Sequence, residues 1–229
     1  MTSTSSKNTI MRLEREMIAP IKTCLGARWE DGLVCEEFGV GYGIADVIVA
    51  RPSREGIRHR RRLGQTTSFP RRAEVQVVRS LLGTRSATFD NLLDLTGISP
   101  KRLRYDVLRF LIAANYVEEI AGDTFRLRAT YRPVIRELWA VEAKMKNWFE
   151  GLCQARRYQH FAHKVYLAIF APHRNRVRDE VLREQNVGLI SVTTGEAEIL
   201  FHPRHQKPRS PELFLLTNER IWEQLHVMA

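Results

Sequence analysis

Glu142 and Lys144 stand two residues apart at the end of an apolar-rich run, residues 135–144, that predicts a β-strand. Side chains two apart on a strand point to the same face, about 7 Å from each other. The carboxylate could hold a divalent cation, and the ammonium could stabilise charge on a phosphate under attack. Glu-x-Lys also occurs by chance in most long proteins, so a solvated strand end is the alternative for the isolated pair.

Asp46 supplies a second carboxylate in an unusual setting. It lies in an apolar run, residues 44–50, that follows a second apolar run, residues 33–38, and a glycine-rich turn. This pattern predicts a β-hairpin whose second strand is covered on both faces. An unpaired acid is costly in such a strand, so a partnered Asp46 is favoured over a simple turn residue.

Composition narrows the class of partner. The chain has 229 residues, 44% of them hydrophobic, and a formal net charge of +10. This length allows one large domain or two small ones, and the charge favours nucleic acid, with an anionic membrane as second choice. Three scattered cysteines argue against a disulfide framework or a cysteine zinc site. The polar N-terminus and the absence of an apolar run of about 18–20 residues predict a soluble cytoplasmic protein with no membrane partner.

Residues 52–71 interrupt the apolar pattern and are predicted to be an arginine-rich linker. Eight arginines stand between residues 51 and 72, against the single acid Glu55. Residues 72–132 then form a separate module. Its predicted elements are helices over 73–82, 88–95 and 100–115, and strands over 117–120 and 124–127 joined through Gly122 and Asp123. This order resembles the winged helix-turn-helix family.

If residues 52–132 are an insertion, the two carboxylates belong to neighbouring parts of one domain. Asp46 and Glu142 are 96 residues apart, but removing residues 52–132 leaves about fifteen between them. The remaining order, a helix over residues 10–25, a hairpin with Asp46, a strand with Glu142-x-Lys144 and a helix over 147–161, resembles the PD-(D/E)XK nuclease superfamily. Ala45 stands where that motif has its proline. The resemblance implies Mg²⁺ or Mn²⁺ held by Asp46 and Glu142, with Lys144 beside the attacked phosphate.

Members of this superfamily also place a glutamate on the first helix, near the metal. Glu14 and Glu16 are the candidates. Glu14 falls within the apolar stripe of the predicted helix, which includes Ile10 and Met11, whereas Glu16 falls on the polar side. A core-facing carboxylate needs a partner, so Glu14 is favoured as a catalytic residue and metal ligand. A salt bridge on the helix surface is the alternative.

Gln154 and Tyr158 share one face of the helix that follows the Glu-x-Lys strand, because they are four residues apart. The pair resembles a signature of the resolvase-like and restriction-type branches. That resemblance implies a catalytic role for Gln154 and a DNA contact for Tyr158. Both are equally compatible with ordinary helix positions.

Two basic groups are predicted to contact DNA. The N-terminal residues of the third helix of a helix-turn-helix meet the major groove, and here they include Lys101, Arg102 and Arg104. Arg60, Arg61 and Arg62 of the linker could neutralise phosphates. Solvated faces are the alternative for both groups. The pairs His160/His163 and His202/His205 have metal-like spacing without further ligands and are interpreted as structural or surface residues.

The sequence therefore predicts an α/β chain with a restriction-endonuclease-like mixed sheet flanked by helices. Residues 1–51 and 133–229 form this discontinuous core, and the winged-helix module is inserted into it. The expected activity is metal-dependent DNA endonuclease, in restriction, phage defence or a mobile element, and is compatible with a homodimer. The rival is a non-catalytic DNA-binding regulator on the same scaffold, and an RNA or nucleotide target is less favoured.

Overall fold

The computed structural model describes residues 13–41 and 43–227. The chain divides into two compact units. The first unit contains the residues up to Arg51 together with Glu137–Arg209, and the second contains Pro52–Arg136 together with Ser210–Ala229. Within 13–41 and 43–227, no helix combines the length and the apolar character that a membrane crossing requires.

The first unit is built on a mixed six-stranded sheet in the order β1-β2-β6-β7-β8-β9. Its strands are β1 (Leu33–Gly39), β2 (Ile44–Pro52), β6 (Ile135–Lys144), β7 (Lys164–Phe170), β8 (Gly188–Val192) and β9 (Ala197–Phe201). Its helices are η1 (Glu14–Met17), α1 (Ile18–Gly26), α7 (Trp148–Tyr158), η3 (Ala171–Arg176) and α8 (Asp179–Glu184). The predicted α/β class and mixed sheet are confirmed.

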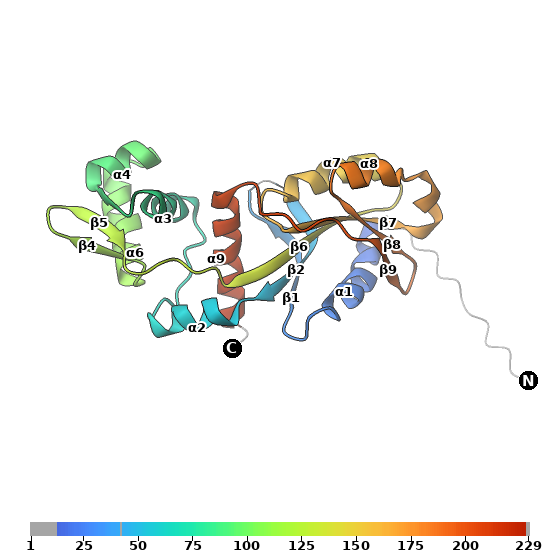
Figure 1. Cartoon of the computed structure of the whole chain (residues 1–229), viewed down its shortest axis with the longest axis horizontal. Helices are drawn as coiled ribbons and strands as arrows, with labels where there is room; N and C mark the ends of the chain where they lie inside the picture. The colour runs from blue at the N-terminus through green and yellow to red at the C-terminus, as the bar shows by residue number, and fades with distance from the viewer. Residues whose placement is uncertain (1–12, 42, 228–229) are drawn as a thin grey trace, which may run out of the picture. The chain divides into compact units, whose positions relative to one another are not determined.

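Strand pairing follows the sequence pattern. The hairpin β1–β2 is antiparallel, the pairs β6–β7 and β7–β8 are parallel, and β8–β9 is antiparallel. Parallel neighbours require crossover connections, and the helices α7 and α8 supply them. Figure 1 shows α1 on one face of the sheet and α7 with α8 on the other.

Alternation along the strands decides which side chains face which helix. Val47 and Val141 pack in a core cluster with Met17 and Leu25 of the first helical segment. Because neighbouring strand residues point to opposite faces, Asp46 and Glu142 lie on the face covered by α7. Asp46 and Glu142 therefore lie on the opposite face of the sheet from the cluster that contains Val47 and Val141.

The first helical segment differs from the predicted helix over residues 10–25. It is a 3-10 turn, η1, continued by α1, which ends at Gly26. Pro20 is buried near the start of α1, where its missing N–H would have no intrahelical partner. Ile10 and Met11, which contribute to the predicted apolar stripe, lie outside the described residues.

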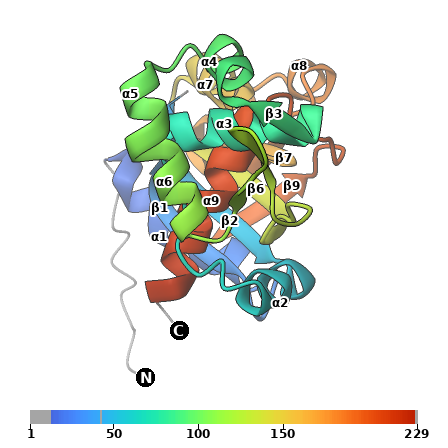
Figure 2. The same cartoon turned by 90° about the vertical axis from the view of Figure 1, so that its left-hand side faces the viewer.

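The second unit combines helices with a three-stranded sheet in the order β3-β5-β4. Its helices are α2 (Arg54–Arg62), α3 (Arg72–Thr84), α4 (Phe89–Thr96), α5 (Pro100–Arg102), η2 (Leu103–Leu108), α6 (Arg109–Ala113) and α9 (Pro211–Val227). Its strands are β3 (Ser86–Thr88), β4 (Val117–Ile120) and β5 (Thr124–Leu127). Figure 2 faces this unit and shows α5 and α6 running on as one rod through the π-helical η2.

Local chemistry explains the boundaries of these elements. The Thr88 hydroxyl accepts the Asn91 N–H at 3.2 Å and caps α4, and Gly97 ends that helix in the left-handed region with φ of 64°. Gly122 and Asp123 both have positive φ and close the antiparallel β4–β5 hairpin. The predicted helix order and hairpin of this module are observed.

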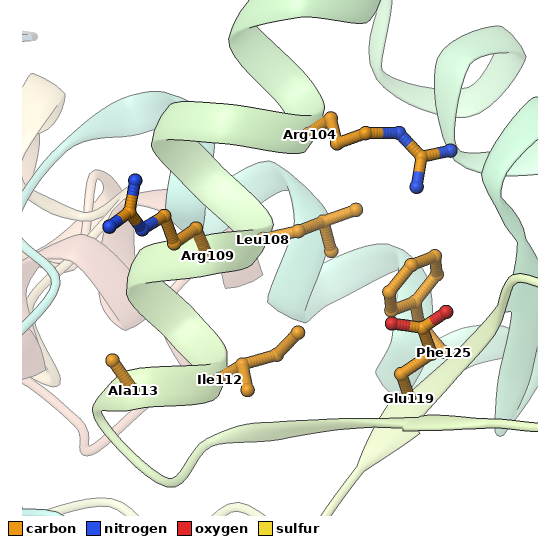
Figure 3. A pocket seen from close by; sticks show the side chains of 7 residues that line it. All are labelled: Arg104, Leu108, Arg109, Ile112, Ala113, Glu119 and Phe125. Carbon is orange, nitrogen blue, oxygen red and sulfur yellow. The ribbon is translucent and has the colours of Figure 1, made fainter.

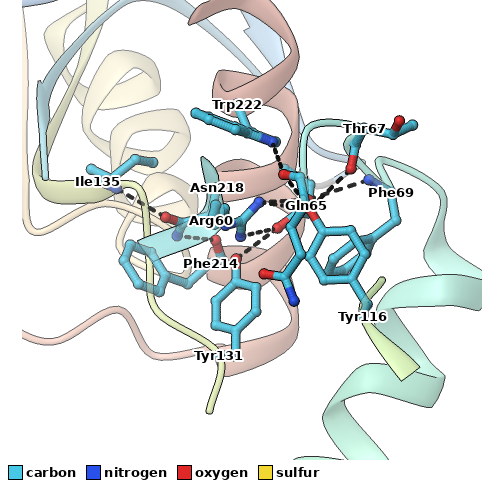
Figure 4. Close-up of polar contacts among 11 residues, drawn as sticks. Arg60, Gln65, Thr67, Phe69, Tyr116, Tyr131, Ile135, Phe214, Asn218 and Trp222 are labelled. Atoms are coloured by element: carbon cyan, nitrogen blue, oxygen red, sulfur yellow. Dashed lines mark hydrogen bonds and ion pairs between the residues drawn. The ribbon is translucent and has the colours of Figure 1, made fainter. Parts of the chain in front are cut away.

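The arginine-rich segment corrects one prediction, because residues 54–62 form helix α2 rather than a loop. Arg60 is 1% exposed, and its guanidinium donates to the Glu219 carboxylate and to the Tyr116 hydroxyl. The Tyr131 hydroxyl donates to the same carboxylate at 2.8 Å. Figure 4 shows Arg60 and Tyr131 within this buried polar network. One arginine of the run thus points inward because a buried acid neutralises it.

The C-terminal helix corrects the predicted domain boundary. Residues 210–229 group with the second unit, not with the nuclease-like core over 133–229. The reason is the same network: Glu219 also accepts the Phe69 N–H at 3.2 Å, and the Trp222 indole donates to the Gln65 carbonyl at 3.1 Å. Helix α9 is therefore part of the core of the second unit.

Candidate functional site

The candidate site lies where β2 and β6 run side by side in the sheet. Asp46 is the third residue of β2, and Glu142 and Lys144 are near the end of β6. The Ala143 N–H donates to the Asp46 carboxylate at 2.7 Å across the two strands. Asp46 and Glu142, which are distant in the sequence, therefore share one face of one sheet.

Lys144 connects two of the acids. Its ammonium lies 3.1 Å from Glu142 Oε1 and 3.6 Å from Glu14 Oε2. Burial alone lowers the pKa of Lys144, but the hydrogen bond and the charge of Glu142 outweigh it and raise that pKa. Lys144 is therefore held as a cation beside the carboxylates.

The structure separates the two glutamates of the first helical segment. Glu14 accepts the Met145 N–H at 3.2 Å in addition to its ion pair with Lys144. Glu16 instead accepts the Leu13 N–H at 3.3 Å, at the start of its own turn. Glu14 thus joins the site, but its side chain is 47% exposed and does not face the core as the helical stripe predicts, because residues 14–17 wind as a 3-10 turn.

Burial shifts the acidity of both strand carboxylates. The pKa of Asp46 is raised by burial, although the Ala143 N–H and Lys144 oppose that shift. The pKa of Glu142 is raised by burial and by the charge of Asp46, against the lowering effects of Tyr158 and Lys144. Two acids that repel each other in a partly buried site bind protons or a cation readily.

Tyr158 has a different place from the one predicted. It is 2% exposed, and its hydroxyl contacts Glu142 Oε2 and the Ile44 carbonyl oxygen, the latter at 2.6 Å. The Tyr158 side chain is therefore buried, and its hydroxyl contacts Glu142 rather than lying at the surface where DNA would bind.

Gln154 lies one turn before Tyr158 on α7. Its side-chain oxygen is buried and has no hydrogen-bond partner among the described residues. A buried polar atom without a partner costs free energy, and such atoms often mark places where an ion, a water or a substrate group completes the bonding. Gln154 therefore remains a candidate contact on the α7 side of the site.

Gly151 is a site residue that the sequence analysis did not identify. A Cβ atom there would lie 2.5 Å from Leu167 Cδ1 and 2.7 Å from Lys144 Cγ. The glycine thus allows α7 to pack directly on the lysine stem. The available signal was a glycine inside a predicted helix, which usually has a packing or functional reason.

The number of carboxylates on the two strands suits a hard divalent cation. Mg²⁺ commonly takes one or two carboxylates and keeps several waters, and Asp46 and Glu142 provide that number. Over residues 13–41 and 43–227, no three His, Cys, Asp or Glu side chains are arranged to hold a metal. The ion pair of Glu14 with Lys144 agrees with this, so Glu14 is not grouped with the two strand acids as a ligand.

The predicted DNA contacts divide into exposed and engaged residues. Lys101 and Arg102 of α5 are exposed. Arg104 instead donates to both carboxylate oxygens of Asp123, at 2.9 and 2.6 Å, and its guanidinium lies 4.0 Å from the Phe89 ring centroid. Arg104 therefore ties its helix to the β4–β5 turn.

The linker arginines divide in the same way. Arg61 and Arg62 of α2 are exposed. Arg60 is bound to Glu219 in the interior of its unit, so the predicted phosphate contact at Arg60 is corrected to a structural role.

A depression of about 380 Å³ lies between η2–α6 and the β4–β5 hairpin. Its floor is apolar, and charged side chains of both signs stand at its edge (Figure 3). The lining residues are Arg104, Leu108, Arg109, Ile112, Ala113, Glu119 and Phe125. A mixed edge around an apolar floor has no selectivity for phosphate, so the exposed cations of α5 are the better candidates for nucleic acid.

Comparisons with known proteins leave the site to be judged on its own geometry. No family model matches the sequence, and comparison with curated proteins found no match. A solved structure of a protein of unknown function from Silicibacter pomeroyi is similar, with a TM-score of 0.44 and 13% identity, covering 96% of this chain and 92% of that one. A likeness at this level carries no argument about function.

Proposed function

We propose that this chain is a metal-dependent DNA endonuclease with a PD-(D/E)XK core. One observation carries the proposal: the hydrogen bond from the Ala143 N–H to Asp46 joins β2 to β6 next to Glu142 and Lys144. An acid, a second acid and a lysine on adjacent strands are the residue types that phosphodiester hydrolysis requires. A hydrogen bond that joins Asp46 to Ala143, 97 residues later in the chain, is hard to explain as a solvated strand end.

The roles of the residues follow from their surroundings. Asp46 and Glu142 would hold Mg²⁺ or Mn²⁺, which when bound polarises a phosphoryl oxygen and lowers the pKa of bound water. Lys144, kept charged by Glu142, would stabilise the charge that develops on the attacked phosphate. Tyr158 would fix the rotamer of Glu142, and Gln154 would offer its unpartnered oxygen to the substrate side of α7.

We further propose that residues 72–132 form a winged-helix module that brings DNA to the core. The order α3, β3, α4, the rod from α5 to α6, and the β4–β5 hairpin supports this. In that arrangement the start of the rod enters the major groove. Lys101 and Arg102 are exposed there, whereas Arg104 secures the wing.

Plasmid cleavage tests the proposal directly. Supercoiled plasmid is incubated with the full-length protein in Mg²⁺ or Mn²⁺, and nicked and linear products are measured. Wild type should cut, and Asp46→Ala and Lys144→Ala should lose cutting by at least about a hundredfold while retaining gel-shift binding. The proposal fails if both variants cut at the wild-type rate.

A non-catalytic DNA-binding regulator is the second candidate. The observation in its favour is that Lys144 forms ion pairs with both Glu142 and Glu14. Such a cluster can also serve as a purely structural element. This reading predicts binding without cutting for every metal and DNA structure tried. It also predicts that Lys144→Ala lowers stability, because the ion pairs of Lys144 with Glu142 and Glu14 are lost.

A further inference from the structure

The second unit has a basic pocket of about 510 Å³ between helix α2 and the chain that follows β5, and neither Asp46 nor Glu142 lines it. We propose that this pocket, here called the α2 pocket, binds a phosphate group. It is lined by Glu55, Arg58, His59, Arg62 and Arg132. The proposal does not depend on nuclease activity.

Helical spacing gathers four of these side chains on one surface. Positions 55 and 58 are three residues apart, as are 59 and 62, and positions 55 and 59 are four apart, as are 58 and 62, so their side chains share a face of α2. Arg132 enters the pocket from the segment after β5. The pocket therefore draws its cations from two separate parts of the chain, as a binding site does and a simple charged helix face does not.

Hydrogen bonds orient the groups within the pocket. His59 Nε2 lies 3.2 Å from the Thr130 carbonyl oxygen, and a carbonyl only accepts, so the proton of neutral His59 is on Nε2. His59 Nδ1 then accepts from the Arg62 guanidinium at 3.3 Å. Arg132 is oriented by its ion pair with Glu55. Two of the three guanidinium groups are thus positioned before any ligand arrives.

The charge of the pocket matches phosphate. Arg58, Arg62 and Arg132 contribute three positive charges, and Glu55 contributes one negative charge. The excess of two positive charges equals the charge of a phosphate dianion. Guanidinium groups also bind phosphate oxygens in a two-pronged geometry, which favours phosphate over chloride.

Two packing features hold the walls of the pocket in place. Gly56 lies so close to the opposite segment that an added Cβ would be 2.0 Å from the Pro133 carbonyl oxygen. Arg60, between the pocket residues in sequence, is anchored on Glu219. Helix α2 is therefore held against the segment that carries Arg132, and Arg58 and Arg62 line the pocket from the helix side.

The test measures phosphate binding to the full-length protein by isothermal titration calorimetry. Sodium phosphate is compared with sodium chloride at equal ionic strength. We expect saturable phosphate binding, which Arg62→Gln and Arg58→Gln each weaken about tenfold. The matched control is Arg61→Gln, since Arg61 is exposed on the same helix but outside the pocket, and it should change the affinity less than twofold. Thermal unfolding in chloride shows that each variant is folded.

Two further arms identify the source of the phosphate. A deoxynucleoside monophosphate is titrated in the same way, and duplex DNA with a 5′-phosphate is compared with the same duplex bearing a 5′-hydroxyl by fluorescence anisotropy. A preference for the phosphorylated end that disappears in Arg62→Gln assigns the pocket to DNA ends. Binding of the small phosphates with no preference between the duplexes assigns it to a free phosphate or nucleotide.

Two results would overturn the α2 pocket. One is that phosphate gives the same heat of binding as chloride at equal ionic strength. The other is an equal loss of affinity in Arg61→Gln and Arg62→Gln, which would mean unspecific attraction to a basic helix. Because the readout is binding and not cleavage, Asp46→Ala should bind phosphate like wild type, and failure of the nuclease proposal leaves this test unaffected.

Discussion

The Tyr158 hydroxyl contacts Glu142 Oε2 and also lies 2.6 Å from the Ile44 carbonyl oxygen, although it has only one hydrogen. A carbonyl only accepts, so when Tyr158 donates to Ile44, Glu142 must supply the proton of the other bond. Burial raises the pKa of Glu142, while the Tyr158 hydroxyl and Lys144 lower it. A cation bound to Glu142 would replace this proton.

Tyr158→Phe should uncouple Glu142 from this arrangement. Removal of a buried hydroxyl that contacts both Glu142 and the Ile44 carbonyl oxygen should lower the free energy of unfolding by about 1–3 kcal/mol. Cleavage should fall because Glu142 loses its fixed rotamer. The matched control is Tyr166→Phe, whose hydroxyl contacts His202 Nδ1 at 2.8 Å within the cluster on the α1 face. Denaturant unfolding and plasmid cleavage check both. Equal cleavage by the two variants would contradict a positioning role for Tyr158.

Asp46→Asn should stabilise the metal-free protein at neutral pH while abolishing its activity. The pKa of Asp46 is raised, first by burial. Its contribution to stability is therefore complete below the unfolded pKa of about 4 and is lost as the pH rises through the folded pKa. Asparagine removes this penalty and can still accept the Ala143 N–H. The melting temperature of the variant should exceed that of wild type at pH 7, and the difference should shrink toward pH 4.

Asp123→Asn is the control of opposite sign. Its pKa is lowered, first by the hydrogen bond from Arg104, so its contribution to stability is present above the unfolded pKa and is lost as the pH falls through the folded one. This variant should melt below wild type at pH 7 and approach it in acid. If both substitutions shift the melting temperature in the same direction at pH 7, the electrostatic account of Asp46 is wrong.

Gly151→Ala tests the close approach of α7 to the site. The new methyl group would meet Leu167 Cδ1 and Lys144 Cγ inside van der Waals distance. Overpacking of this kind costs about 1–3 kcal/mol, and displacement of Lys144 should reduce cleavage. Gly83→Ala in α3 is the control, since nothing lies within 4 Å of its added Cβ, and a helical Gly→Ala change there should be neutral or stabilising. Calorimetric melting and plasmid cleavage distinguish the two.

Arg60→Met should be far more destabilising than Arg61→Met on the same helix. Loss of Arg60 leaves the Glu219 carboxylate buried and uncompensated, at a cost of about 3–5 kcal/mol. Loss of the exposed Arg61 should change stability by no more than about 0.5 kcal/mol. Combining Arg60→Met with Glu219→Leu should recover much of the loss in urea unfolding. Similar unfolding midpoints for the Arg60 and Arg61 variants would exclude the buried ion pair as a stabilising element.

The sequence identified a site residue where a charged side chain lies in an otherwise apolar, buried segment. An aspartate inside an apolar strand needs a partner, so Asp46 could be singled out without knowing the fold, and its meeting with β6 followed from looping out one module. The role of Tyr158 could not be predicted in the same way. Its spacing from Gln154 gives a shared helix face, but whether that face meets solvent or Glu142 depends on how α7 packs on the sheet.

Arg60 shows why the fold of the second unit was harder to predict. Within the run from Arg58 to Arg62, nothing local distinguishes the one arginine that is buried, because its partner Glu219 follows 159 residues later. Because Glu219 lies on α9, the same ion pair places α9 in the second unit and not in the predicted nuclease-like core. Periodicity and turn signals fix local elements such as the β4–β5 hairpin, whereas buried polar pairs between distant segments are decided only by the whole fold.

The salt dependence of DNA binding separates contact residues from structural ones. Arg102→Gln and Lys101→Gln should each weaken binding and reduce the slope of log affinity against log salt by about 1, since each cation that neutralises a phosphate releases counterions. Arg104→Gln should instead lower thermal stability and leave the slope unchanged, because Arg104 is already paired with Asp123. Anisotropy titrations of duplex DNA over a salt series measure all three slopes. An unchanged slope for both α5 variants would show that the start of that helix does not contact DNA. This conclusion would hold whether or not the protein cleaves DNA.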